Sequence, residues 1–503
     1  MTPQILIVIG YIIAIFIAVV VGFKPGQSPV MAAMVLFPVA VFFLNRPQVL
    51  AMIIIALYAS TITLPFFPQN FNMYLLLSFL MTVMMIAAGI IHKRRKFALN
   101  SVYYMMIGYA LVMFYTAALR GFGLRFLGGQ TWGGAAYVRL WMIIAFVVVC
   151  RDVQLSPGQW KKSIYWLCIL SILPPLGQLI YAKSGGAIWQ HYQFIKPDYG
   201  AVQLLQGMES NEEMIRVQPA QTTGYMFCLF FLLLPRKTLF QKILKLGILI
   251  FALVLAGVSG HRIAIVFIVA TLVFYYSSDF SLGWRRFINR YTVLMAAGVL
   301  FVALFARYLP LNYQRSVSVI PFANIDPEAR ASAEATTLWR IELWRHLLKE
   351  VPDYFWLGKG FAFTAADAIP AYRQQNPTYE DYIVSRNFHS GPLSLLILMG
   401  FPGTVFAALF LLFGNIRYYR LAKKDWIDPQ LRHIYVVLYS GFASFTVLLI
   451  FVHGSATNSF EQFFFWAFML EGLVRADGRQ SPLSERPAPV PAPRIPAAIR
   501  LNA

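Results

Sequence analysis

The chain has few charged residues and little cysteine. Only 13% of its 503 residues are Asp, Glu, Lys or Arg, whereas a typical soluble domain carries about 25%. This scarcity excludes an ordinary series of soluble domains. The three cysteines, Cys150, Cys168 and Cys228, all lie in apolar stretches, and their spacing provides neither a disulfide framework nor a metal site.

Apolar residues are present in excess. Residues of the types AVILMFWYC make up 59% of the chain, and aromatic residues alone make up 16%. Because a membrane-spanning helix needs about 20 mostly apolar residues, these runs predict an all-α polytopic membrane protein with about 12–14 transmembrane helices. The predicted spans are 4–22, 29–44, 48–66, 73–91, 100–119, 134–150, 163–182, 219–235, 243–259, 261–278, 291–307, 390–414, 433–452 and 458–474.

Acidic residues are half as numerous as basic ones. The chain has 42 Lys and Arg against 21 Asp and Glu, which gives a formal charge of +21. Since cytoplasmic loops of membrane proteins accumulate Lys and Arg, we expect the basic connections and both termini to be cytoplasmic. Topology then explains the charge, and no nucleic-acid partner is expected. The basic connections are 92–96, 151–162, 236–242, 284–290, 415–424 and the tail after 474.

The predicted spans divide the chain into successive parts. These are N-terminal transmembrane helices (1–182), an outer loop (183–218), further transmembrane helices (219–307), a large outer loop (308–388), C-terminal transmembrane helices (389–474) and a Pro/Ala-rich, disordered cytoplasmic tail (475–503). The 308–388 loop is long for a helix connection, which favours a functional role and short helices within it.

The large outer loop contains a segment with helical periodicity. Leu338, Ile341, Trp344, Leu347 and Leu348 share one face of a helix. Basic side chains and tryptophan accompany this apolar face. The pattern predicts a helix that lies along the membrane surface.

Charged residues beside helix ends on the outer face require an explanation, because charge at membrane depth is costly. Arg216 precedes the predicted span at 219, Arg262 ends a Ser-Gly-His-Arg turn, and Arg386 and His389 stand where the large loop re-enters the membrane. Each arginine alone is also explained by contact with lipid phosphates, and His389 alone by a helix cap. Glu461, in the last predicted span, is explained by pairing with a neighbouring side chain.

Together these residues favour a site for an anionic lipid headgroup. A guanidinium group pairs bidentately with phosphate oxygens, and two such groups stabilise a diphosphate leaving group without a metal. A histidine beside them is able to take a proton from an incoming hydroxyl. The outer segments contain no DxD metal motif and no Gly-rich nucleotide loop. We therefore expect no metal and a donor that arrives through the membrane.

The region around His389 resembles the O-antigen ligase family. His389 and Ser390 are followed by nine residues and then by Gly400-Phe401-Pro402-Gly403, which is similar to the family signature of His, then Asn, Ser or Gln, nine residues and a Gly-x-x-Gly-type turn.

Other segments extend this resemblance over roughly 210–410. The Ser-Gly-His-Arg turn and the segment around Arg216 are similar to arginine-containing segments of the family. A pattern of the family's large periplasmic loop is matched by Arg340, Trp344, Pro352, Gly358 and Gly360.

The resemblance implies a metal-independent glycosyltransferase of the bacterial inner membrane. Family members are GT-C-like helical bundles that use undecaprenyl-diphosphate-linked glycans and need no cofactor. By this resemblance 308–388 is a periplasmic loop, Arg262 and Arg216 bind the donor diphosphate, and His389 activates the acceptor hydroxyl or orients the donor. Arg340 and Arg386 are second-rank candidates. The reaction is expected to invert the anomeric carbon.

The identity of the acceptor stays open at this level. Ligases transfer the glycan to lipid A–core, whereas other family members polymerise surface or exopolysaccharide repeats, and others are protein O-oligosaccharyltransferases. Two alternatives lie outside this activity. One is a transporter or flippase of lipid-linked glycans, which predicts charged residues along a route through the membrane. The other is an acyltransferase that uses His389.

Overall fold

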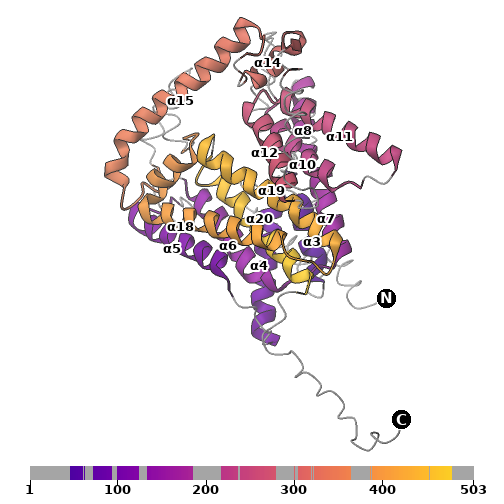
Figure 1. Cartoon of the computed structure of the whole chain (residues 1–503). Coiled ribbons are helices and arrows are strands. Elements are labelled where there is room, and N and C mark those ends of the chain that lie inside the picture. Colours follow the sequence, from indigo (N-terminus) through magenta and orange to yellow (C-terminus); the bar gives the residue numbers. More distant parts are fainter. Residues whose placement is uncertain are drawn as a thin grey trace, which may run out of the picture.

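The computed structural model shows a bundle of helices with one long helix at its margin (Figure 1). The described residues are 43, 46–60, 62, 72–92, 99–123, 133–184, 217–235, 238–278, 300, 304–318, 320, 322–363, 386, 388–452 and 454–478. The predicted span at 4–22 lies wholly outside these residues. The predicted tail at 475–503 lies mostly outside them, but Arg475 and Ala476 belong to the helix Asn458–Ala476 and not to a disordered tail. The spans at 29–44 and 291–307 and the outer loop at 183–218 lie mostly outside them.

The described residues fold into helices, without any extended strand. The α-helices are α3 (Pro47–Leu57), α4 (Met73–His92), α5 (Ser101–Arg120), α6 (Gly134–Val149), α7 (Pro157–Leu170), α8 (Leu173–Lys183), α10 (Ala220–Leu233), α11 (Leu239–Val258), α12 (Arg262–Ser278), α14 (Leu311–Val317), α15 (Pro327–Tyr354), α18 (Gly391–Ala422), α19 (Pro429–Phe451) and α20 (Asn458–Ala476). The predicted all-α class is confirmed.

Among the described residues, six helical stretches are long and apolar enough to cross a membrane. They comprise α5, α6 with the turn after it, the α7–α8 stretch, α11, α18 and α19, and four shorter apolar helices accompany them. The chain is therefore a polytopic membrane protein. Most predicted spans agree closely with these helices, and the span predicted at 163–182 corresponds to the α7–α8 stretch. The helix breaks after Leu170 and restarts at Leu173, because Pro174 and Pro175 lack the N–H groups that a helix interior needs.

Polar residues mark where several helices begin. Asn100 accepts hydrogen bonds from the first backbone N–H groups of α5. Ser156 and Thr238 form capping boxes at the starts of α7 and α11, and Asp428 caps α19. Such residues satisfy N–H groups that have no partner within the helix, so the sequence sets these boundaries locally.

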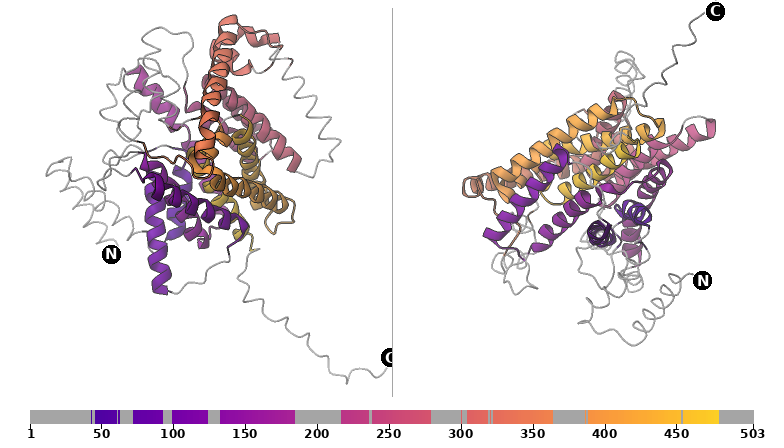
Figure 2. Two further views of the ribbon diagram at one scale, coloured as in Figure 1. Left: turned by 90° about the vertical axis from the view of Figure 1, so that its left-hand side faces the viewer. Right: turned by 90° about the horizontal axis from the view of Figure 1, so that it is seen from below.

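The C-terminal helix α20 lies in the interior of the bundle, where it contacts α6, α18 and α19. Figure 2 shows α5, α6, α18, α19 and α20 running side by side. Two buried acids of α20 are paired: Glu461 with Arg139 of α6, and Glu471 with Arg417 of α18, at 2.6 Å between Nε and Oε1. The expectation that Glu461 pairs with a neighbour is confirmed.

Helix α15 stands at the margin of the bundle and connects two parts of it. It contacts α14 and α18, and Figure 1 shows it running between these two regions. Leu343 and Leu347 are buried, whereas Leu338 and Leu348 are 62% and 56% exposed. The predicted apolar face is therefore divided: Leu347 packs inward, while the exposed leucines remain available to a membrane surface.

Candidate functional site

His389 occupies a strained position directly before α18. Its φ is 51°, in the left-handed region, and it precedes Ser390, the N-cap of α18. Non-glycine residues adopt this region rarely, and such conformations cluster at functional sites. The preceding residue, Phe388, is fully buried, so packing holds the backbone that carries the imidazole.

Helix α15 fixes this segment from outside the bundle. The ring of Trp339 meets the His389 imidazole edge to face, with 5.5 Å between centroids. One turn further along, the Trp344 Nε1–H donates to the carbonyl of Phe388 at 3.1 Å. Trp344 was predicted on the apolar face of this helix and in the family's loop pattern. The contacts of the two tryptophans with His389 and Phe388 are features that the sequence pattern did not reveal.

The turn before α12 brings Arg262 to the same helix. Gly260 has a φ of 64°, and the Ser259 hydroxyl accepts a hydrogen bond from the His261 N–H at 3.2 Å. Arg262 is the first residue of α12. Its Nη2 donates to the Ala333 carbonyl at 3.3 Å and to Thr337 Oγ1 at 3.0 Å. The Ser-Gly-His-Arg turn therefore docks against α15 one turn before Arg340.

Arg340 is half-buried on α15, next in sequence to Trp339. Its Nε is buried and has no hydrogen-bond partner. Burial lowers the pKa of Arg340, and the positive charge of Arg262 lowers it further. Two guanidinium groups close enough to repel one another favour an anion between them. An opposite charge offsets both the desolvation of Arg340 and its repulsion by Arg262.

The other arginines of the predicted site have different positions. Arg386 also has a positive φ, 60°, and its Nη2 donates to the Ala362 carbonyl at 2.8 Å, which fixes the end of the large loop to its earlier part. Arg216 lies outside the described residues. The structure thus brings His389, Arg340 and Arg262 together along α15, while the role of Arg216 stays a prediction.

The glycine motifs of the sequence meet at a break in α18. Gly400 interrupts the helix with φ 67° and ψ −178°. Pro402 has no N–H to give to the Leu398 carbonyl, which instead accepts the Gly360 N–H at 3.0 Å. A Cβ on Gly400 would lie 2.8 Å from the Gly358 nitrogen. Glycine is therefore required where the loop reaches the helix.

A second exchange of hydrogen bonds adjoins this one. The Lys359 N–H donates to the Ile397 carbonyl at 2.7 Å, and the Phe401 N–H donates to the Phe355 carbonyl. The loop segment 355–360 thus replaces bonds that a continuous helix would make within itself. The loop that follows α15 and the helix that follows His389 are consequently held together.

The described residues contain no cluster of three or more His, Cys, Asp or Glu side chains suited to a metal ion. The groups that α15 gathers are one imidazole and two guanidinium groups. Guanidinium groups bind anions and donate hydrogen bonds but have no lone pair for a metal. Such a set of cationic side chains is chemically suited to an anionic ligand.

Comparison with known families agrees with this geometry. Residues 244–408 match the family model described as O-antigen ligase. No curated protein is significantly similar to the chain. The matched segment includes Arg262, Arg340 and His389, together with the break at Gly400. The chain is therefore an all-α polytopic membrane protein whose residues 244–408 are similar to the O-antigen ligase family.

Proposed function

We propose that the protein is a glycan transferase of the O-antigen ligase type, which moves a glycan from a polyprenyl diphosphate to an acceptor hydroxyl. The bacterial inner membrane is the proposed location, with both termini in the cytoplasm and the His389 site at the periplasmic face. The alternation of basic connections supports this orientation. The donor is an undecaprenyl-diphosphate-linked glycan, and the acceptor is lipid A–core or a second glycan.

The arrangement along α15 is the observation that carries the proposal. Trp339 contacts His389, and the next residue, Arg340, lies within the field of Arg262. A proton acceptor and two permanent cations therefore lie beside one stretch of α15, residues 333–340. This is the combination that transfer from a lipid diphosphate requires: one group for the acceptor and two for the leaving group.

In the proposed reaction the acceptor oxygen attacks the anomeric carbon as the bond from that carbon to the phosphate oxygen breaks. His389 takes the proton from the acceptor hydroxyl. The electron pair of the broken bond leaves with the lipid diphosphate, and Arg262 and Arg340 stabilise its charge. Arg216 is a further proposed ligand of the diphosphate, and Arg386 positions the loop end through Ala362. A single displacement of this kind inverts the anomeric carbon.

The test is His389→Ala in the native host, followed by gel analysis of surface glycans and lipid-linked glycans. We expect a loss of transfer of about 100-fold or more, as removal of a general base produces. Long chains that remain on the carrier identify a ligase, whereas single repeats on the carrier identify a polymerase. Loss of glycan from a protein acceptor identifies protein glycosylation.

The matched control is His346→Ala, which changes an exposed histidine of α15 and is expected to leave the glycan profile unchanged. An unchanged profile in His389→Ala, with normal amounts of inserted protein, would contradict the assignment of His389. Purified protein that neither binds nor transfers a lipid-linked glycan would contradict the proposed function as a whole.

A further inference from the structure

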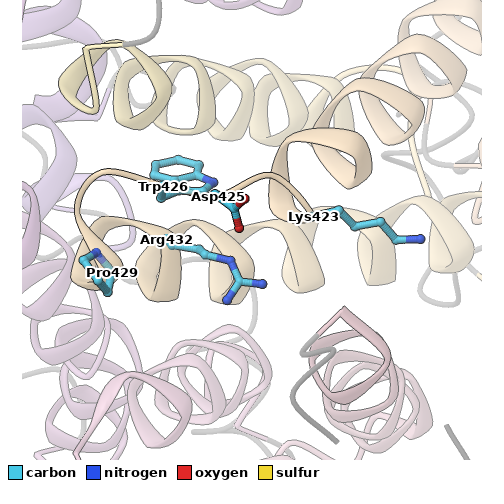
Figure 3. A pocket seen from close by; sticks show the side chains of 5 residues that line it. All are labelled: Lys423, Asp425, Trp426, Pro429 and Arg432. Carbon is cyan, nitrogen blue, oxygen red and sulfur yellow. The ribbon is translucent and has the colours of Figure 1, made fainter. Parts of the chain in front are cut away.

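A cavity lies at the end of α18 that is opposite to His389. It has a volume of about 500 Å³ and is lined by Lys423, Asp425, Trp426, Pro429 and Arg432 (Figure 3). These residues belong to the connection from α18 to α19 and to the first turn of α19. The volume falls within the range of small-molecule sites in proteins.

The walls of the cavity are anchored to the last turn of α18. The Trp426 Nε1–H donates to the Leu421 carbonyl at 2.9 Å, and the indole is only 9% exposed. Arg432 donates from Nε to the Ala422 carbonyl at 3.3 Å. Both side chains donate to carbonyl groups of the last turn of α18, so the indole and the guanidinium group are held in place beside the opening.

An apolar stripe of α18 leads along the helix to this cavity. Leu412, Ile416 and Tyr419 are 52%, 39% and 37% exposed, and their spacing places them on one helix face together with Lys423. The Lys423 Nζ lies 4.2 Å from the centroid of the Tyr419 ring. The stripe belongs to a helix long and apolar enough to cross a membrane. An apolar track that ends in a cation fits an amphiphile with a charged head.

The charges of the lining specify that head more closely. Lys423 and Arg432 are suited to a phosphodiester, whereas Asp425 would repel one. A headgroup that carries an ammonium group beside its phosphate pairs all three side chains. The cavity holds two cations and one carboxylate, which is complementary to a phosphoethanolamine headgroup.

We propose that this cavity binds phosphatidylethanolamine. Its phosphate lies between Lys423 and Arg432, its ammonium group faces Asp425, and an acyl chain follows Leu412, Ile416 and Tyr419. The proposal is independent of the transferase reaction, since the cavity and His389 lie at opposite ends of α18. It assigns a structural lipid to the junction of α18 and α19.

The test uses the purified full-length protein in detergent micelles, titrated with short-chain phosphatidylethanolamine, short-chain phosphatidylglycerol or inorganic phosphate. Affinity is measured from the rise in Tm and from bound lipid in native mass spectrometry. We expect phosphatidylethanolamine to bind most tightly. The double variant Lys423→Gln/Arg432→Gln should weaken binding about 25-fold, or about fivefold for each cation removed.

Two further variants make the test specific. Lys424→Gln removes an exposed cation that does not line the cavity, so it should bind like the wild type. Asp425→Asn should weaken phosphatidylethanolamine and strengthen phosphatidylglycerol, because it removes the partner of the ammonium group. Arg432→Lys keeps the charge and should retain most of the binding.

Three results would overturn the proposal. One is equal lipid binding in the double variant and in Lys424→Gln, which indicates unspecific attraction to a basic surface. Another is stabilisation by inorganic phosphate equal to that by lipid, which indicates a site for free phosphate. The third is preference for phosphatidylglycerol in the wild type, which indicates that Asp425 does not contact the headgroup.

Discussion

At the scale of single residues, the site combines strain with uncompensated charge. His389 holds a left-handed backbone conformation next to a buried phenylalanine, and Arg340 keeps a buried nitrogen without a partner. Both features cost folding free energy. Selection for stability alone would remove such costs. The strain at His389 and the unpaired nitrogen of Arg340 therefore agree with selection for binding and chemistry.

The strain at His389 predicts an unusual order of stabilities among its variants. His389→Gly should be about 1 kcal/mol more stable than His389→Ala, because glycine has no Cβ that would clash with the backbone at a φ of 51°. Both variants should be inactive, since both lack the imidazole. Thermal unfolding of the purified proteins measures the difference, and equal Tm values would show that the backbone is unstrained at this position.

The lowered pKa of Arg340 gives a prediction about charge. A cation whose pKa is lower in the folded than in the unfolded protein destabilises the fold at every pH below that folded pKa. Arg340→Gln should therefore have a Tm no lower than the wild type in the absence of donor, while transfer falls about 100-fold.

Added lipid diphosphate separates the proposed role of Arg340 from a structural one. It should raise the Tm of the wild type by binding only the folded protein, and it should raise that of Arg340→Gln much less. Arg345→Gln, which removes an exposed arginine of the same helix, is the matched control and should respond like the wild type. An equal response in all three proteins would remove Arg340 from the diphosphate site.

At the scale of elements, α15 and the broken α18 define the site between them. α15 supplies Trp339, Trp344 and Arg340, and α18 begins two residues after His389. The break at Gly400 allows loop 355–360 to bond to α18 in place of a helical turn. The position of α15 over His389 thus depends on a helix interruption eleven residues further along the chain.

Substitution of Gly400 tests this dependence. Gly400→Ala places a Cβ 2.8 Å from the Gly358 nitrogen at a φ of 67°, so we expect a loss of about 2 kcal/mol or more of stability and reduced transfer. Gly247→Ala is the control, because a Cβ there meets no atom within 4 Å in the helix α11. It should be neutral or stabilising by up to about 1 kcal/mol. Comparable effects of the two substitutions would contradict a required glycine at 400.

At the scale of the whole molecule, charge pairs tie the C-terminal helix to earlier parts of the bundle. Arg139 and Glu461 join α6 to α20, and Arg417 and Glu471 join α18 to α20. The acids are almost fully buried, where a lone charge is far more costly than a pair. These pairs give both buried acids of α20 a structural partner, so neither acid requires a transport route to explain it.

Removal of one partner should therefore harm folding more than removal of both. Glu461→Gln leaves Arg139 without its acidic partner and should cost about 3–5 kcal/mol, whereas Arg139→Met/Glu461→Met should recover most of that loss. Unfolding in mixed micelles measures both free energies. If the loss of stability in the double variant equals the summed losses of Arg139→Met and Glu461→Met alone, the two side chains do not interact.

The sequence predicts much of this architecture, and where it falls short the physical cause is clear. Apolar length and capping residues are local signals, so most spans and their ends follow from the chain alone. His389 and Arg262 stand in short motifs and were found for that reason. The contacts of Trp339 and Trp344 were missed, because an aromatic ring that packs on a distant loop has the same pattern as one that faces lipid. Arg340 was predicted only as a second-rank site residue, because its nearness to Arg262 arises only from tertiary structure.

The break in α18 has a consequence for how the molecule opens. The carbonyls of Ile397 and Leu398 have the backbone of Lys359 and Gly360 as their partners. Lifting that loop would strip those carbonyls of hydrogen bonds at two residues that are fully buried. The loop end is consequently no independent lid: its detachment and the loosening of α18 form a single cooperative event. Any movement that admits an acceptor must therefore occur elsewhere and keep the hydrogen bonds between residues 359–360 and 397–398 intact.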